Sequence, residues 1–172
     1  MNRLVEIVDK ILIEFLMILM VVMVLDVSWG VITRYVAPKP SAFTEELAAF
    51  LMMWIGLLGG AYALRQKAHL GIDILTSRLS PKNQHRWDIL IYVMVLLFAL
   101  LVLIWGGLRL VSIQLYLNQV SAAMKIKMGY VYLVLPLTGM LLAFYSINFI
   151  LQAINGANAQ LPERTEPLAG LE

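Results

Sequence analysis

The sequence predicts an all-α integral membrane protein with four transmembrane helices. Hydrophobic residues make up 61% of its 172 positions and charged residues only 14%, whereas a soluble domain is about half apolar and about a quarter charged. The apolar residues gather into four stretches with few charges. Each stretch is long enough, as a helix, to cross a hydrocarbon layer of about 30 Å.

The N-terminal stretch is expected to begin as an amphipathic helix along the membrane surface and then turn inward. Apolar residues recur at helical spacing over residues 1–14, opposite five charged ones. A first span at about 11–33 follows. A cleaved signal peptide is the competing interpretation, but three acids stand where a signal peptide carries basic residues, and no small-residue cleavage site closes the apolar run.

The second span is predicted at 47–64, eighteen residues without a charge, or about 27 Å of α-helix. Prolines just upstream exclude a helix running in from the first span. Ser41 or Thr44 can cap the new helix, which places Glu45 and Glu46 in its first turn, where the helix dipole favours anions. The span therefore begins abruptly at a water boundary.

Gly56 and Gly60 lie four residues apart and share one face of this helix, which Ala49 and Met53 extend. Because their side chains are missing, another helix can approach closely there. The alternative is that glycine and alanine are simply common in membrane helices. We expect this face to contact a partner helix.

The segment 65–86 is too short and too polar to cross, and it is expected to form an interfacial helix between the second and third spans. Apolar residues recur on one side of it and charges on the other. Arg65, Lys67, His69 and Asp73 are candidate anchors to the membrane surface, and we expect His69 to order a turn or meet headgroups rather than to relay protons.

The third span is predicted at 87–108. Trp87 and Trp105 lie near its two ends, where amphipathic rings settle at the lipid boundary, and Arg109 is expected to close it.

The fourth span is predicted at 128–151, where Pro136 and Gly139 are expected to bend the helix. The membrane domain thus covers 1–155. The polar tail at 156–172 contains two prolines and is expected to be disordered.

Positive charges predict the orientation. With four spans, both termini and the 65–86 connection lie on one side with eight Lys and Arg residues, against five on the other. The positive-inside rule therefore places both termini in the cytoplasm.

The chain lacks the residues that most sites need. It has no cysteine, which excludes disulfides, thiolate ligands and cysteine nucleophiles. Its two histidines both fall in the interfacial connection, so the pair of axial ligands for a membrane haem is missing. No hydrolase, phosphate-loop or metal motif is present. We expect no catalytic residue, cofactor, metal ion or nucleic acid.

Asp26 is expected about 22 Å along the first helix, in the outer part of the bilayer, where a lone carboxylate is costly. Arg109, at the same end of the third span, is the candidate partner for an intramembrane ion pair. A cation of a partner chain, a site reached by water and a proton-carrying role remain as alternatives. Glu14 lies closer to an interface.

One pattern resembles a known family. It consists of R-Y, prolines, E-E-L, then W-I-G-L-L-G-G-A, and finally H-L-G-I-D with a later S-P. This pattern is similar to that of the DctQ-like small membrane subunit of tripartite ATP-independent periplasmic (TRAP) transporters. The likeness is close over 34–81 and looser elsewhere. Phe43 departs from it, because the family often has tryptophan shortly before the acidic pair.

The resemblance implies a four-helix subunit in a bacterial inner membrane. Its implied partners are a large DctM-like subunit carrying substrate and sodium sites, a periplasmic binding protein that delivers an organic acid, and phospholipid. The acid would be a sialic acid or a C4-dicarboxylate. The sequence agrees with a scaffold role, since it shows no inverted repeat or broken helix pair. Candidate interface residues are Arg34, Glu45, Glu46, Gly56 and Gly60.

The alternative from another class is a self-sufficient small exporter, which would exchange protons for a cationic drug through Glu14 or Asp26. Such an exporter would be active as one purified chain, whereas a scaffold would copurify with a larger membrane protein.

Overall fold

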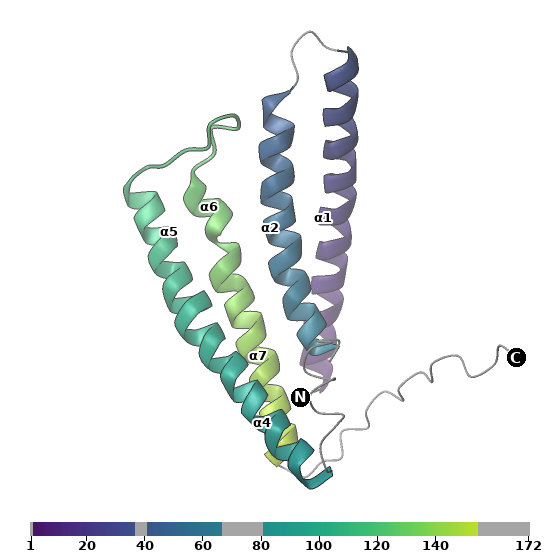
Figure 1. The fold of residues 1–172 in the computed structure, drawn as a ribbon, viewed down its shortest axis with the longest axis vertical. Coiled ribbons are helices and arrows are strands. Elements are labelled where there is room, and N and C mark those ends of the chain that lie inside the picture. The colour runs from purple at the N-terminus through teal and green to yellow at the C-terminus, as the bar shows by residue number, and fades with distance from the viewer. Residues whose placement is uncertain (1, 37–40, 67–80, 155–172) are drawn as a thin grey trace, which may run out of the picture.

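The computed structural model describes residues 2–36, 41–66 and 81–154 (Figure 1). Within these ranges the chain is helical and contains no strand; Val120 and Lys127 form one isolated bridge. The helices are α1 (Asn2–Val36), α2 (Ala42–Arg65), α4 (Pro81–Phe98), the π-helical η1 (Ala99–Gly106), α5 (Gly107–Tyr116), α6 (Met128–Tyr132) and α7 (Val134–Ile154).

Four helical stretches are long and apolar enough to cross a membrane, which confirms the predicted fold class. They are Val5–Val36, Ala42–Arg65, Ile89–Tyr116 and Met128–Leu151.

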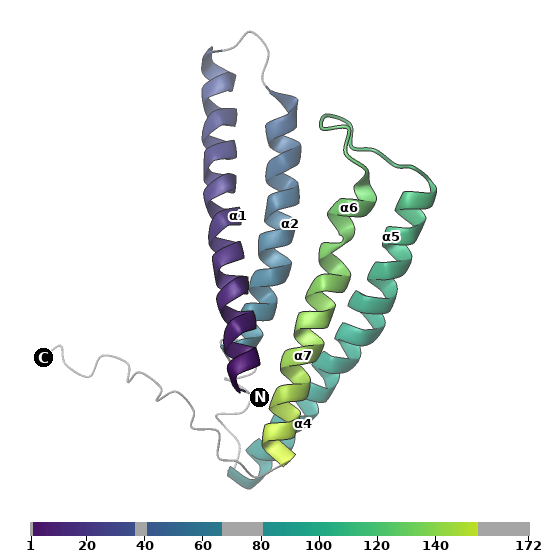
Figure 2. The ribbon, with the colours of Figure 1, turned by 180° about the vertical axis from the view of Figure 1, so that it is seen from behind.

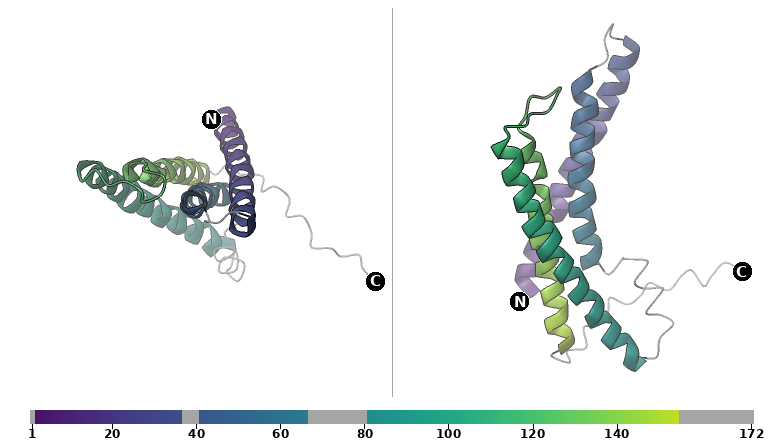
Figure 3. Two further views of the ribbon diagram at one scale, coloured as in Figure 1. Left: turned by 90° about the horizontal axis from the view of Figure 1, so that it is seen from above. Right: turned by 60° about the vertical axis from the view of Figure 1, so that its left-hand side comes forward.

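The helices form two antiparallel pairs. The first pair is α1 with α2, and the second is the continuous rod α4–η1–α5 with α6–α7 (Figures 1 and 2). Both views, and the view from above in Figure 3, show the same order: α1, α2, α6–α7 and then α5. The outer helices α1 and α5 therefore lie on opposite sides of the molecule.

The second and fourth spans supply the centre of the core. Leu58 of α2 and Val134 and Tyr145 of α7 are fully buried. Half of the most apolar part of the fourth span is buried, against 11% for the first. The first span thus presents most of its surface outward, as a helix in lipid can.

The N-terminal segment differs from its expected course, because residues 2–36 form one uninterrupted helix. No proline occurs in α1, and its one glycine is Gly30, near the far end. Its 35 residues extend about 52 Å, well beyond a hydrocarbon core of about 30 Å. The charged first turns can therefore leave the hydrocarbon without a separate surface helix.

The third helix also continues past its expected end at Arg109, to Tyr116. It stops near Asn118, whose φ of 47° is incompatible with a right-handed helix.

The fourth helix is interrupted at Leu133, between α6 and α7. Pro136 explains the position, because its ring clashes with the carbonyl four residues earlier and it has no N–H to donate. Gly139 has another role: a Cβ there would lie 2.7 Å from Ile104 Cγ1 and 3.1 Å from the Ala99 carbonyl oxygen. It lets α7 approach η1.

The predicted interfacial helix between the second and third spans, with Lys67, His69 and Asp73, lies largely outside the described residues. The tail at 156–172 also lies outside them.

Candidate subunit interface and the contacts that shape it

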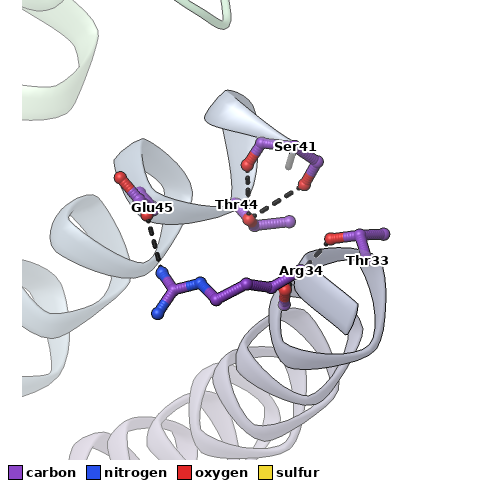
Figure 4. Close-up of polar contacts among 6 residues, drawn as sticks. Thr33, Arg34, Ser41, Thr44 and Glu45 are labelled. Carbon is purple, nitrogen blue, oxygen red and sulfur yellow. Dashed lines mark hydrogen bonds and ion pairs between the residues drawn. The ribbon is translucent and has the colours of Figure 1, made fainter. Parts of the chain in front are cut away.

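Polar contacts gather where the end of α1 meets the start of α2, remote from the N-terminus (Figure 4). Arg34 Nη2 donates to Glu45 Oε1 at 3.0 Å, and both side chains are mostly exposed. The buried Thr44 hydroxyl donates to the Ser41 carbonyl at 2.8 Å. A Cβ on Gly30 would lie 3.0 Å from Thr44 Oγ1, so this glycine allows the close approach of α1 to α2.

Glu46, in contrast, binds a distant part of the chain. Its Oε2 accepts hydrogen bonds from Ser121 Oγ at 2.6 Å and from the N–H groups of Ala123 and Met124 at 2.9 and 3.0 Å. Its Oε1 accepts one from the Ala122 N–H at 3.1 Å. These bonds join α2 to the loop between α5 and α6, so the carboxylate is occupied within the chain.

A second polar contact joins three helices at the opposite end. Arg65 Nε donates to Asp9 Oδ2 at 3.0 Å, and the Tyr145 hydroxyl donates to Asp9 Oδ1 at 2.7 Å. The Arg65 guanidinium also lies 6.0 Å from the centre of the Phe149 ring. Arg65, predicted as a membrane anchor, therefore binds inside the helix bundle.

Neither Asp9 nor Tyr145 was predicted as a contact residue, and no local sequence pattern indicates their contact. Along the chain, Asp9 is 56 positions from Arg65 and 136 positions from Tyr145. Asp9 appeared only as one of several charges on an amphipathic face.

The face that carries Gly56 and Gly60 is open. A Cβ built on either glycine meets no atom within 4 Å, and Ala49, Met52 and Gly56 are exposed. No helix of the described chain covers this face. We call Ala49, Gly56 and Gly60 the small-residue face. Met53, which was expected to extend it, is instead partly buried against the core.

The structure does not bring Asp26 and Arg109 together, so the expected intramembrane pair is absent from the chain. Asp26 is 8% exposed, and its Oδ2 has no hydrogen-bond partner. Arg109 instead lies with its guanidinium 5.8 Å from the Trp105 ring. The physical reason is the helix order, because α1 and α5 occupy opposite sides of the molecule (Figure 3).

The described residues include no group of three His, Cys, Asp or Glu side chains that could hold a metal ion. The described helices form a bundle that polar contacts join near both ends of α2, and small residues are exposed on one face of that helix.

Comparison with known families shows which kind of protein this helix bundle is. Residues 23–156 match the family described as "Tripartite ATP-independent periplasmic transporters, DctQ component". The chain belongs to the DctQ family. It is a small permease subunit of a TRAP transporter and not an enzyme, and its four apolar helices make it a multi-pass inner-membrane protein.

Three relatives of this DctQ chain illustrate the range of the family. The isethionate TRAP transporter permease protein DctMQ of Oleidesulfovibrio alaskensis is 30% identical over 135 residues, which cover 75% of this chain and 21% of that protein. A putative TRAP transporter small permease protein of Haemophilus influenzae is 23% identical over 154 residues, 90% of this chain and 94% of the relative. The sialic acid small permease protein SiaQ of Vibrio cholerae is 33% identical over 64 residues, 37% of each chain.

The DctQ chain therefore spans about the whole length of one small permease relative but only a fifth of DctMQ.

Proposed function

We propose that this DctQ subunit is an obligate structural partner of a large TRAP membrane subunit and moves no substrate by itself. The observation that supports this most directly is the contrast within α2. Glu46 and Arg65, near its two ends, bind other helices or loops of the same chain, while the small-residue face between them is open. A helix bundle joined near both ends of α2, with small residues exposed on one face of that helix, suits a scaffold.

The proposed interface with the large subunit runs along the small-residue face of α2 towards the start of that helix. Gly56 and Gly60 allow a helix of the large subunit to pack against the α2 backbone. Arg34 in the last turn of α1 and Glu45 in the first turn of α2 form an exposed pair. This pair can exchange partners at little cost, because surface pairs contribute only about 0 to 1 kcal/mol.

The name DctMQ supports a direct partnership. A protein about five times as long as the matched segment carries a region similar to this chain. We propose that this DctQ subunit contacts a separate large subunit in the same way that the matching region of DctMQ contacts the rest of that longer protein.

The proposed substrate is an organic acid. Relatives are named for isethionate and for sialic acid, which are both organic anions, and the family resemblance adds C4-dicarboxylates. Sodium coupling and delivery by a periplasmic binding protein belong to the same proposal, as do cytoplasmic termini and lipid contacts of Lys67, His69 and Asp73.

The chain's few acids at membrane depth argue against a self-sufficient exporter. Asp26 is buried and has no partner cation within the described residues, while Glu14 is exposed and only 4.0 Å from Lys10. Glu14 lines an open surface cavity with Asp9 and Lys10, and Asp26 is not among the residues that line that cavity.

Uptake into proteoliposomes tests the proposal. With a sodium gradient and the cognate binding protein, we expect uptake only when this chain and the large subunit are both present. Each subunit alone serves as the control. Transport by this chain alone would overturn the scaffold role in favour of the exporter.

A further inference from the structure

The loop at residues 117–127, between α5 and α6, has a fixed shape although it contains no regular secondary structure. We call it the α5–α6 loop. Besides the four hydrogen bonds to Glu46, the Ser121 N–H donates to the Ile126 carbonyl at 2.9 Å, and the Met128 N–H donates to the Gln119 carbonyl at 2.9 Å. The loop is thus ordered by its own backbone and by one carboxylate from another helix pair.

Two residues of the loop have unusual backbone angles. Asn118 and Lys125 have φ values of 47° and 58°. Asparagine tolerates this left-handed region, but lysine is disfavoured there because its Cβ crowds the carbonyl oxygen. Such conformations persist where surrounding contacts enforce them, and they concentrate at functional sites. The bonds from Glu46 to the adjacent residues 121–124 are contacts of that kind.

The fixed loop displays apolar and basic groups. Tyr116, at the end of α5, is 87% exposed, and Leu117 and Val120 are 56% and 53% exposed. Lys125 and Lys127 are exposed. Among the residues that the structure describes, no carboxylate pairs with either lysine, since Glu45 binds Arg34 and Glu46 binds the loop backbone.

We propose that the α5–α6 loop is a preformed docking surface for an acidic segment of the large membrane subunit, and that Glu46 is the positioning residue that sets its shape. The proposal rests on the proposed function, because it takes the large subunit as the partner. Two lysines beside exposed apolar side chains match an acidic protein surface with an apolar centre.

A protein explains the fixed shape better than anionic lipid does. Flexible lysines can reach lipid headgroups from any loop. A protein partner gains from a loop that is already ordered, because binding then costs less conformational entropy.

Zero-length coupling tests the surface directly. A carbodiimide joins a lysine amine to a carboxylate that it touches, so in the purified complex we expect a bond from Lys125 or Lys127 to an Asp or Glu of the large subunit, identified by peptide mass spectrometry. The Lys125→Arg, Lys127→Arg double variant should keep the complex and lose the bond, because arginine keeps the charge but does not couple.

Affinity provides the second measurement. Titration of labelled large subunit in detergent should show at least tenfold weaker binding to the Lys125→Glu, Lys127→Glu double variant. Glu46→Gln should also weaken binding several-fold, because the amide group would face N–H donors. Glu14→Gln is the matched control, since it makes the same change on an exposed carboxylate of α1 that makes no contact with the α5–α6 loop. It should change the affinity less than twofold.

The outcomes separate the two proposals. If the parent chain does not bind the large subunit at all, the proposed function fails. If the complex forms but the double charge reversal leaves the affinity unchanged, only the loop inference fails. Should the lysines matter solely in vesicles that contain phosphatidylglycerol and not in detergent, the surface binds lipid and the inference is overturned. If Glu46→Gln impairs folding, the lysine variants still test the loop inference, because Lys125 and Lys127 are exposed and their replacement should not disturb the fold.

Discussion

Asp9 and Glu46 are carboxylates that join helices far apart in the chain. Asp9 accepts hydrogen bonds from α2 and α7, and Glu46 accepts four from the α5–α6 loop. Removing one partner of a buried charged group leaves the other unpaired, which costs more than the net stabilisation by the intact bond. At the scale of residues, these two acids hold the helix pairs together.

Replacing Tyr145 with phenylalanine tests the Asp9 contact. Tyr145→Phe removes the hydroxyl that donates to Asp9 and keeps the ring, so we expect a loss of about 1 to 2 kcal/mol in unfolding free energy. The measurement is the thermal unfolding midpoint of the purified protein in detergent. Tyr116→Phe, at a ring that is 87% exposed, is the control and should leave the midpoint unchanged. An equal effect of both changes would contradict the role assigned to this bond.

At the scale of elements, glycines at helix contacts fall into two kinds. Gly139 and Gly129 sit against other helices of the chain, where an added Cβ would come within 2.7 Å of Ile104 and 2.5 Å of Leu115. Gly56 and Gly60 meet nothing. The first kind serves the fold of this subunit, and the second is free to serve assembly.

This distinction predicts opposite results for two leucine substitutions. Gly60→Leu should leave the unfolding midpoint of the isolated chain nearly unchanged and reduce recovery of the large subunit at least several-fold, because the new side chain occupies the space of a partner helix. Gly139→Leu should lower the midpoint, because overpacking the contact between α7 and η1 should reduce the unfolding free energy by about 1 to 3 kcal/mol. If Gly60→Leu copurified with the large subunit as well as the parent does, the small-residue face would be a lipid face.

Features that depend on neighbouring residues could be predicted from the sequence, whereas contacts between residues far apart in the chain could not. The four spans follow from long apolar stretches with few charges, and the break at Leu133 follows from Pro136. The pairing of Asp26 with Arg109 was wrong for this chain, because charge and depth alone do not say which helices are neighbours. Likewise, the contact of Glu46 with residues 121–124 depends on how two helix pairs meet, which no local period encodes.

On the scale of the whole molecule, the two ends of the bundle differ. The start of α1 and the end of α7 lie at one end, and the end of α1, the start of α2 and the α5–α6 loop lie at the other (Figures 1 and 2). Four crossings require these two ends to face opposite sides of the membrane. The proposed orientation rests on charge, because the sequence predicts eight Lys and Arg residues on the side of the termini and five on the other side.

Single cysteines resolve the orientation because the chain has no other thiol. We expect an impermeant maleimide added outside intact cells to label Tyr35→Cys and to miss Asn2→Cys. Tyr35 is 85% exposed near the end of α1, and because it adjoins Arg34 of the proposed interface, the labelling uses cells that lack the large subunit. Permeabilised cells, in which both variants should react, provide the control. Labelling of Asn2→Cys alone would reverse the orientation but keep the four spans, because the two positions would still lie on opposite sides. Labelling of both from outside would contradict the crossing of α1 itself, since its 35 residues extend about 52 Å and join the two positions through one helix.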